Sequence, residues 1–333
     1  YGEVRTPLIY RKLKKSIFSR SSKVEKKKKK LSTNKSFNSI YRKISPGGIV
    51  YMTESCEGLY NIRAKPTLYK NYLIVCGRNL FLVVMDLEKR KIIWKRRVDG
   101  GYGYISPEVS DSNIYFASKN LYIYNLYSGK LINTITILPK DMELYNDELF
   151  VLLKNSLLIY SIKDFKEIRK IRKGGDNLIV RKGKIWVLDY YGWTCYSVDG
   201  ELLWERKGSF ESSTGKIEPV YNNDTIYIPS SKCLVAIDAQ NGNIIQKFKI
   251  DSTISTTPSI SENAIIFGTV EKGLFCYDKL GNLKWNKSYD WLDNPKILSN
   301  QVIKDGNVYV HCFRDSLYAV SYTHLTLPTI CSV

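Results

Sequence analysis

A short pattern recurs along this chain about every 40 residues, and it constrains the fold more than any other feature of the sequence. A strand-like segment with an aromatic or aliphatic residue is followed by a second segment that ends in Asp, Asn or Ser, and then by a tight turn. The clearest copies run through 226–243 and 265–285. Self-similarity with such a period is typical of a propeller, a solenoid or an array, because each copy is one supersecondary unit that buries its faces against its neighbours.

Seven copies align on the aromatic or aliphatic residue of the first segment. These anchors are Ile74, Tyr115, Phe150, Trp186, Tyr227, Phe267 and Tyr309, separated by 41, 35, 36, 41, 40 and 42 residues. A polar slot lies 10 to 12 residues after six of the anchors and holds Asp86, Asn125, Ser161, Ser197, Asp238 and Asp278. This distance is that of one strand, a tight turn and a second strand.

The composition of each copy favours β-structure. Tyr, Ile and Val are abundant and alternate with polar residues, as in 120–124 and 307–310. Glycines such as Gly129 and Gly242 follow the polar slot, where a hairpin turn needs a positive φ. No stretch of 64–320 shows a helical stripe of any length. The sequence therefore predicts an all-β propeller of four-stranded antiparallel blades, seven or eight in number.

A further repeated position, seven or eight residues after the polar slot, is Trp in three of six copies. A large aromatic at the end of a blade's last strand fills the wedge between neighbouring blades, and aromatic residues contribute mainly through buried area. Ligand stacking by the same rings is the alternative. The residues that we interpret as structural parts of the repeat are Asp86, Trp94, Trp204, Asp238, Asp278 and Trp285.

The motif Ala-x-Asp-x-x-Thr/Asn-Gly-Lys/Asn-x-x-Trp, preceded by a Pro-led strand and a Tyr-Val strand, resembles the repeat of PQQ-type β-propellers. Segments 236–246 and 85–94 match it, and Pro66, Pro107, Pro219 and Pro258 occupy the Pro that opens the repeat. The family includes quinoprotein dehydrogenases and the outer-membrane assembly lipoprotein of bacteria, so the fold alone does not fix the function. The resemblance is to the non-enzymatic branch and implies an extracytoplasmic location.

The formal net charge of +19 is concentrated at one end of the chain. Residues 1–43 hold 15 Lys and Arg against two Glu, whereas the remainder holds 36 basic and 30 acidic residues. Blocks of like charge are usually flexible, solvated tails, so 1–43 is predicted to be a flexible basic arm. Its alternative role is adhesion to nucleic acid or to acidic lipid headgroups. No apolar run is long enough to span a membrane.

The repeat stops after Ala319, where a further polar slot, turn and strand are expected. The segment 321–333 resembles a translated sequencing adapter, and such segments are excluded from fold reasoning. The predicted organisation is therefore a basic arm over 1–43, a propeller over 44–320 and a non-native tail over 321–333. Under this interpretation the chain is a fragment whose true termini lie elsewhere.

Few residues could support catalysis. His311 is the single His outside the tail and lies in a predicted strand, which disfavours metal sites and Ser-His-Asp arrangements. A PQQ-dependent dehydrogenase holds PQQ with Ca²⁺ and uses a general-base Asp, but the Asp residues of this repeat fall in the structural slot. The sequence predicts no catalytic residue, no metal site and no cofactor, with a PQQ-dependent dehydrogenase as the alternative.

Exposed aromatics offer a candidate binding surface. In a four-stranded blade, the turn between the middle strands and the connection to the next blade lie on the same face. The aromatic residues expected there are Tyr102, Tyr104, Tyr190, Tyr191, Tyr289 and Trp291. Tyr and Trp are enriched at binding hot spots, although the same rings can pack loops together. The sequence thus favours a non-catalytic binding or scaffold module for a protein, a peptide or a glycan.

Overall fold

The computed structural model describes the side chains of residues 64–76, 81–98, 105–208, 217–287, 301–303 and 307–310. It also gives the backbone of strand residues in 42–45, 48–51, 304, 311–312, 316–321 and 329–331. The chain divides into two compact units, 1–58 and 59–333. The smaller unit contains one antiparallel hairpin of β1 (Arg42–Ser45) and β2 (Gly48–Tyr51).

The larger unit contains seven four-stranded antiparallel sheets among its described residues. Sheets 1 to 3 comprise β3 (Thr67–Tyr69), β4 (Tyr72–Cys76), β5 (Phe81–Asp86) and β6 (Lys91–Arg97); β7 (Glu108–Ser110), β8 (Asn113–Ala117), β9 (Leu121–Asn125) and β10 (Leu131–Ile135); and β11 (Asp141–Tyr145), β12 (Glu148–Leu152), β13 (Leu157–Ser161) and β14 (Glu167–Ile171). Sheets 4 and 5 comprise β15 (Asn177–Arg181), β16 (Lys184–Asp189), β17 (Gly192–Ser197) and β18 (Leu202–Lys207); and β19 (Val220–Asn222), β20 (Thr225–Pro229), β21 (Cys233–Asp238) and β22 (Ile244–Lys249). Sheets 6 and 7 comprise β23 (Ser259–Ile260), β24 (Ile265–Gly268), β25 (Leu274–Tyr277) and β26 (Leu283–Lys287); and β27 (Val302–Lys304), β28 (Asn307–Cys312), β29 (Ser316–Ser321) and β30 (Thr329–Cys331).

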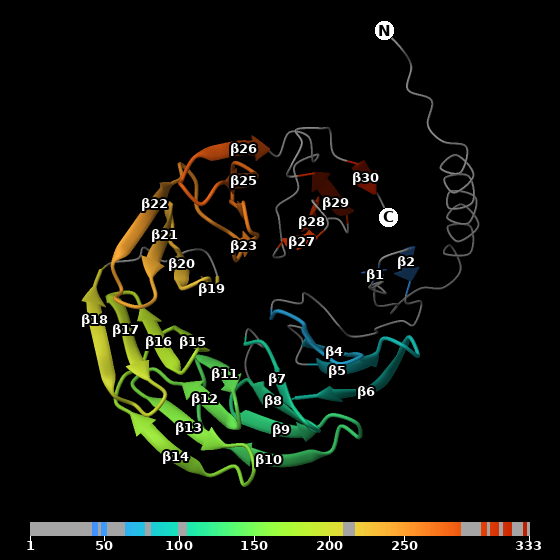
Figure 1. The fold of residues 1–333 in the computed structure, drawn as a ribbon. Coiled ribbons are helices and arrows are strands. Elements are labelled where there is room, and N and C mark those ends of the chain that lie inside the picture. Colours follow the sequence, from blue (N-terminus) through green and yellow to red (C-terminus); the bar gives the residue numbers. More distant parts are fainter. Residues whose placement is uncertain are drawn as a thin grey trace, which may run out of the picture. The chain divides into compact units, whose positions relative to one another are not determined.

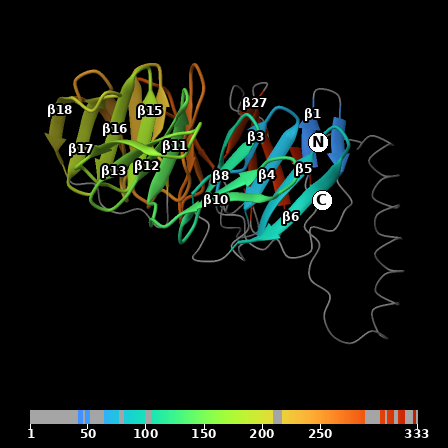
Figure 2. The ribbon, with the colours of Figure 1, turned by 90° about the horizontal axis from the view of Figure 1, so that it is seen from below.

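Each sheet is a meander whose strands pair in sequence order, from the first strand to the fourth (Figure 1). The side view in Figure 2 shows the strands of one sheet, β15 to β18, running side by side between two sets of turns. No helix occurs within the ranges given above. The predicted all-β propeller of four-stranded antiparallel blades is confirmed, and seven blades are described.

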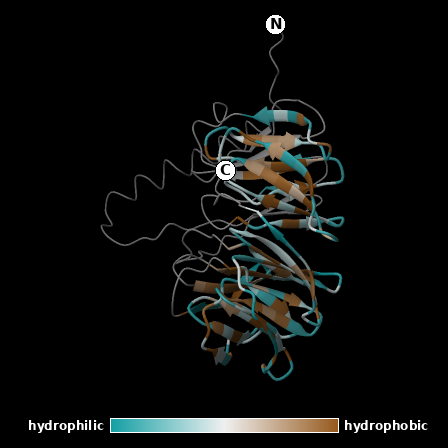
Figure 3. Cartoon of the chain, turned by 90° about the vertical axis from the view of Figure 1, so that its left-hand side faces the viewer, coloured by the Kyte–Doolittle hydropathy of each residue, from teal (hydrophilic) through white to brown (hydrophobic). Residues whose placement is uncertain are grey.

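Hydrophobic contacts join each sheet to the next one in the sequence. Six separate clusters of buried side chains each draw residues from two consecutive sheets, from sheets 1 and 2 through to sheets 6 and 7. Apolar residues therefore concentrate along the strands, while the turns between them are hydrophilic (Figure 3). Burial between neighbouring sheets is the main stabilising term for such a stack, because no blade can cover both its faces alone.

A β-bulge interrupts the pairing of the third and fourth strands in sheets 1 to 6. The register shifts by one residue directly before the repeated Trp position in every case. The extra residues are Ile93, Ile132, Ile168, Leu203, Ile245 and Lys284. A bulge bends and twists a strand, which makes an outer edge a poorer template for pairing with another chain.

Strands occur near both ends of the predicted propeller. β2 contains Ile49 to Tyr51 and pairs with β1 within the smaller unit. β30 lies in the predicted non-native tail and pairs with β29. The pairing of three residues does not test whether the tail is native. The boundaries 1–43, 44–320 and 321–333 therefore stay predictions.

Candidate functional site

The polar slot lies at the turn between the third and fourth strands of sheets 1 to 6. The Asp86 carboxylate accepts hydrogen bonds from the backbone N–H groups of Glu88 (3.0 Å) and Lys89 (2.9 Å). The Asp278 carboxylate accepts them from the backbone of Leu280 (3.0 Å) and Asn282 (2.8 Å). A short side chain that bonds the backbone two to four residues on stabilises such a turn. The Lys89 N–H group lowers the pKa of Asp86.

The other slot residues make the same kind of contact. Asn125 accepts from the backbone of residues 127 and 128, and Asp238 accepts from that of residues 240 and 241. The hydroxyls of Ser161 and Ser197 accept from residues 163 and 201. The chemistry needed at this position is one hydrogen-bond acceptor, which explains why Asp, Asn and Ser all occupy it.

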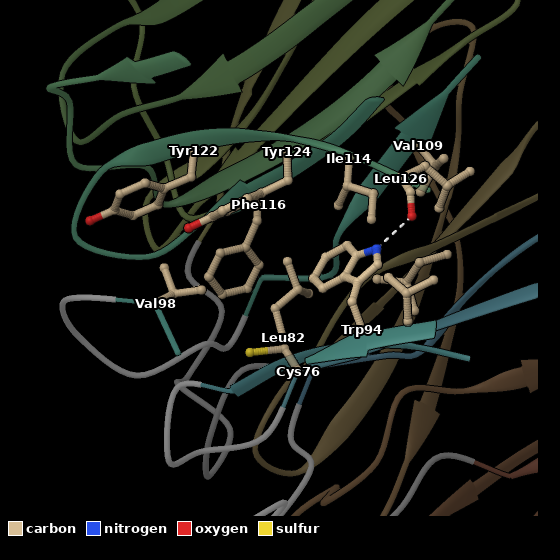
Figure 4. Close-up of a cluster of buried hydrophobic side chains, with 12 residues drawn as sticks. Cys76, Leu82, Trp94, Val98, Val109, Ile114, Phe116, Tyr122, Tyr124 and Leu126 are labelled. Atoms are coloured by element: carbon tan, nitrogen blue, oxygen red, sulfur yellow. Dashed lines mark hydrogen bonds between the residues drawn. The ribbon is translucent and has the colours of Figure 1, made fainter. Parts of the chain in front are cut away.

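The repeated Trp position packs on the turn of the following sheet. Figure 4 shows Trp94 among the buried side chains shared by sheets 1 and 2, with its indole N–H donating to the Leu126 carbonyl at 2.6 Å. A Cβ added at Gly129 would lie 2.6 Å from the Trp94 ring. Glycine is therefore required at this turn both for its positive φ of 65° and for the close approach of the indole.

Different side chains occupy the same wedge in other sheets. Trp204 lies against Gly242, where an added Cβ would be 2.6 Å from its ring. Arg169 of sheet 3 donates from its guanidinium to the Val198 carbonyl at 2.6 Å, beside the next sheet's turn. Trp285 is also buried, at 8% exposure. These positions face neighbouring sheets, and the rings of Trp94, Trp204 and Trp285 are all buried rather than exposed for ligand stacking.

The loop face is defined here as the turns between second and third strands together with the connections from a fourth strand to the next sheet. Antiparallel pairing places both at the same end of each sheet. Tyr190 and Tyr191 form the turn between β16 and β17, and they are 46% and 78% exposed. The carbonyl of Tyr191 accepts a hydrogen bond from the Gly208 N–H at 2.9 Å, which joins the turn to the connection after β18.

The two Tyr rings are held in a defined arrangement. Their centroids are 5.1 Å apart with an interplanar angle of 84°, which is an edge-to-face contact. The backbone N–H of Tyr191 donates to the Asp189 carboxylate at 2.7 Å, and Lys173 lies 3.6 Å from that carboxylate. An ordered, solvent-facing aromatic pair is suited to contact a partner. The other predicted binding residues lie outside the described part of the chain, namely Tyr102, Tyr104, Tyr289 and Trp291.

A second group of polar residues lies on the first strands of sheets 2 to 5 and was missed by the sequence reasoning. Glu108 belongs to β7, Asp141 and Glu143 to β11, and Arg181 to β15, while Glu218 precedes β19. Glu108 and Glu143 occupy the same repeat position, since each pairs with the anchor of its sheet. An acidic residue at this position in two consecutive copies is the signal that could have found part of this group.

These carboxylates connect consecutive first strands. Asp141 accepts a hydrogen bond from the Leu178 N–H at 2.9 Å, and Glu143 accepts one from the Val180 N–H at 2.6 Å. Glu143 also forms an ion pair with Arg181. The N–H groups of Leu178 and Val180 lie on the free edge of β15 and would otherwise be unpaired. Side chains of β11 accept hydrogen bonds from them.

Burial shifts the ionisation of two members of this group. Burial raises the pKa of Glu108 to about 8, and the charge of Glu143 adds to the shift. Burial raises the pKa of Glu143 to about 7 against the opposing effect of Arg181. Shifted carboxyl pKa values occur at catalytic sites, but structural networks produce them as well. The hydrogen bonds of Asp141 and Glu143 run from sheet 3 to sheet 4, which assigns these two carboxyl groups to blade contacts.

No group of three or more His, Cys, Asp and Glu side chains in the described ranges has a geometry suited to a metal ion. No helix long and apolar enough to cross a membrane occurs in those ranges either.

Comparison with known proteins agrees with the geometry of the repeat. A family model described as outer membrane protein assembly factor BamB matches residues 194–323. This part of the chain is therefore similar to the PQQ-type β-propeller repeat. A curated relative of this propeller, outer membrane protein assembly factor BamB of Francisella tularensis subsp. tularensis (strain SCHU S4 / Schu 4), is 31% identical over 75 residues. That match covers 21% of the propeller chain and only 16% of the relative's length.

Solved structures share the propeller fold at low sequence identity. The crystal structure of BamB from Moraxella catarrhalis has a TM-score of 0.62 and 10% identity, covering 75% of this chain and 82% of that one. Dihydro-heme d1 dehydrogenase NirN, solved in complex with DHE, has a TM-score of 0.68 and 11% identity, covering 82% of this chain and 67% of that one. One neighbour is named as an assembly factor and the other as an enzyme, so these likenesses establish the fold alone.

Proposed function

We propose that this chain is a non-catalytic binding scaffold that captures a protein partner on its loop face. The observation that carries the proposal is the ordered Tyr190–Tyr191 pair, with the two side chains 46% and 78% exposed on a turn fixed by backbone hydrogen bonds. Large aromatic side chains with little conformational freedom to lose are favoured at the centre of binding sites. A glycan is the alternative ligand for the same pair.

The comparisons support a binding role and an extracytoplasmic location. The matching family model and the curated relative are both named as an outer membrane protein assembly factor. An assembly factor acts by contacting other proteins, and the geometry of the repeat-structural residues leaves their side chains engaged between sheets. A PQQ-dependent dehydrogenase remains the alternative proposal, and the NirN structure shows that an enzyme can share this fold.

Site-specific photo-crosslinking tests the binding proposal. A photoreactive phenylalanine analogue replaces Tyr191 in one variant and Tyr127 in a matched control. Tyr127 is 46% exposed, against 78% for Tyr191, and lies in the turn between β9 and β10, at the opposite end of its sheet. We expect a discrete crosslinked protein from position 191 in cells of the source organism, and none from position 127. Equal crosslinking from both positions, or none from position 191, contradicts the proposal.

Two further measurements separate the alternatives. Tyr190→Ala should abolish the complex crosslinked from position 191, and Tyr191→Ala should abolish a complex crosslinked from position 190. Both substitutions should leave the thermal midpoint nearly unchanged, because both rings are largely outside the core. A large loss of stability would show that the pair packs the loops together. Robust dye-linked oxidation of alcohols or sugars after addition of PQQ and Ca²⁺ would replace the scaffold proposal with the dehydrogenase.

A further inference from the structure

The turns between second and third strands carry a repeated positive charge that the proposed function does not use. One exposed lysine occupies this turn in each of sheets 2, 3, 5 and 6. These residues are Lys119, Lys154, Lys232 and Lys272. In sheet 4 the same turn holds the Tyr190–Tyr191 pair instead. The loop face therefore presents an aromatic pair in one sheet and a lysine in each of four others, accompanied in sheet 6 by the exposed Glu271.

Backbone hydrogen bonds fix the turns that carry these lysines. The N–H of Ser118 donates to the Asn120 carbonyl at 2.9 Å, and that of Ser230 donates to the Cys233 carbonyl at 2.8 Å. Equivalent bonds close the turns at 153–156 and 269–273. The lysine stems thus start from ordered positions on one face, which lowers the entropic cost of presenting several charges to one ligand.

The opposite end of each of these four sheets has one acidic turn, while the other turn at that end, between the third and fourth strands, carries lysine in sheets 2, 3 and 6. The turns between first and second strands hold Asp111, Asp147, Asp224 and Glu262 in sheets 2, 3, 5 and 6. The acidic turn and the loop-face turn lie at opposite ends of the second strand, which is about 15 Å long at roughly 3.4 Å per residue. Each of these sheets therefore has a lysine on its loop-face turn and an acidic residue on its turn between the first and second strands.

Several of the loop-face lysines are available to a ligand. Lys119 and Lys154 form no ion pair with any residue in the described part of the chain. Lys272 pairs with Asp251 at 2.6 Å, but both groups are exposed, so the pair exchanges readily with a competing carboxylate. The carboxyl groups of Glu108 and Glu143 add less negative charge near neutral pH than ordinary carboxylates do, because burial raises their pKa values to about 8 and about 7.

The turn of sheet 3 lies directly beside the Tyr pair of sheet 4. The Lys154 carbonyl lies so close to Gly174 that an added Cβ would be 2.0 Å away. Gly174 follows Lys173, whose ammonium group is 3.6 Å from the Asp189 carboxylate, and Asp189 in turn accepts from the Tyr191 N–H. Lys173 also pairs with Glu205 at 3.1 Å, so cationic, acidic and aromatic groups lie near one another across these two sheets.

We propose that this surface binds an acidic segment of the partner protein. Carboxylates of the segment pair with Lys119, Lys154 and Lys232, and an apolar or aromatic side chain packs on Tyr190 and Tyr191. The proposal rests on the proposed function and specifies the partner's chemistry. A protein segment fits better than a lipid surface or a nucleic acid. The described turns offer Tyr rather than aliphatic residues for insertion, and Lys rather than the Arg forks that suit phosphates.

Charge reversal on matched faces tests the proposal. The first variant combines Lys119→Glu, Lys154→Glu and Lys232→Glu. The control combines Lys130→Glu, Lys163→Glu and Lys279→Glu, whose sites lie on turns between third and fourth strands and therefore on the opposite face. Both variants change the net charge equally, so the difference between them reports the location of the charges. Five of the six sites are exposed and Lys279 is half-buried, and unchanged thermal midpoints confirm folding.

The probe is a labelled synthetic peptide of Glu and Asp residues around a central Phe, and a second peptide with Gln and Asn in place of the acids. Fluorescence anisotropy should show binding of the acidic peptide that weakens with added salt. We expect the loop-face variant to bind it about tenfold more weakly or worse, and the control to change by less than about threefold. Equal weakening in both variants, or equal binding of the neutral peptide, overturns the proposal.

Competitors decide between classes of partner. Vesicles of phosphatidylglycerol or a single-stranded oligonucleotide that bind the loop face more tightly than the acidic peptide would replace the proposal with a lipid surface or a nucleic acid. Photo-crosslinking separates this inference from the proposed function. A protein crosslinked from position 191 that survives the loop-face charge reversal leaves the scaffold standing and removes the acidic segment.

Discussion

The contact between Trp94 and Gly129 gives a quantitative test of how consecutive blades are joined. In Gly129→Ala, the new Cβ would lie 2.6 Å from the indole of the preceding sheet, at a backbone φ of 65°. The left-handed backbone costs about 1 kcal/mol for Ala. The steric overlap adds about 1 to 3 kcal/mol, which is the usual range for overpacking. The total is about 2 to 4 kcal/mol.

Gly183→Ala is the matched control for this variant. Gly183 has a similar φ of 72°, but an added Cβ there would meet no atom within 4 Å. The control therefore carries the backbone cost of about 1 kcal/mol and no overlap. The difference between the two variants isolates the contact with Trp94, and it is expected to be about 1 to 3 kcal/mol.

Urea unfolding, followed by Trp fluorescence and by far-UV circular dichroism, measures the two free energies. The midpoint of Gly129→Ala should fall clearly below that of Gly183→Ala. In the background of Trp94→Leu, the smaller side chain removes the overlap, so Gly129→Ala should then cost about the same as Gly183→Ala. Equal stabilities of the two single variants, or no coupling in this double-mutant cycle, would refute the reasoning.

Two further predictions concern buried ionisable groups. Between the ordinary value of 4.5 and the raised values of about 8 for Glu108 and about 7 for Glu143, the folded state binds more protons than the unfolded chain, so stability falls as the pH rises through this window. Glu108→Gln should flatten that decline in urea unfolding measured across the window. At about pH 8 the change in the pH-dependent part of the free energy of unfolding should be on the order of a few kcal/mol. A decline that is as steep as in the parent protein contradicts the assignment. Burial raises the pKa of Cys195 and Cys276 to about 12, so an aromatic disulfide reagent should modify the half-buried Cys233 first and these two thiols after unfolding. Mass spectrometry of the modified peptides gives the order, and early labelling of Cys195 or Cys276 would count against their burial.

The functional roles within the repeat could be predicted only in part. The polar slot and the Trp position are visible as recurring residue types, and the structure places them at turns and between sheets. The exposure of the Tyr190–Tyr191 pair follows from the strand order that the repeat implies. The ring geometry and the hydrogen bond from Gly208 to Tyr191 depend on residues distant in sequence, so no local pattern could give them.

The group around Glu108 shows most clearly what sequence reasoning missed. Its members are separated by up to 110 residues and come from four sheets. Two of them accept N–H groups of β15, a contact that exists only when β11 and β15 lie side by side. Their role in joining blades, and the raised pKa values that burial causes, were therefore decided by packing.

The sequence by itself determined the class of fold, the strand order and the turn chemistry. These depend on alternation, on acceptors that bond nearby backbone groups and on glycines that tolerate a positive φ, all of which are local properties. The tertiary structure decided which side chains fill the wedges, which carboxyl groups are desolvated and which charges gather on the loop face. Those properties depend on how neighbouring sheets pack, because burial and proximity arise between segments that a linear pattern leaves far apart.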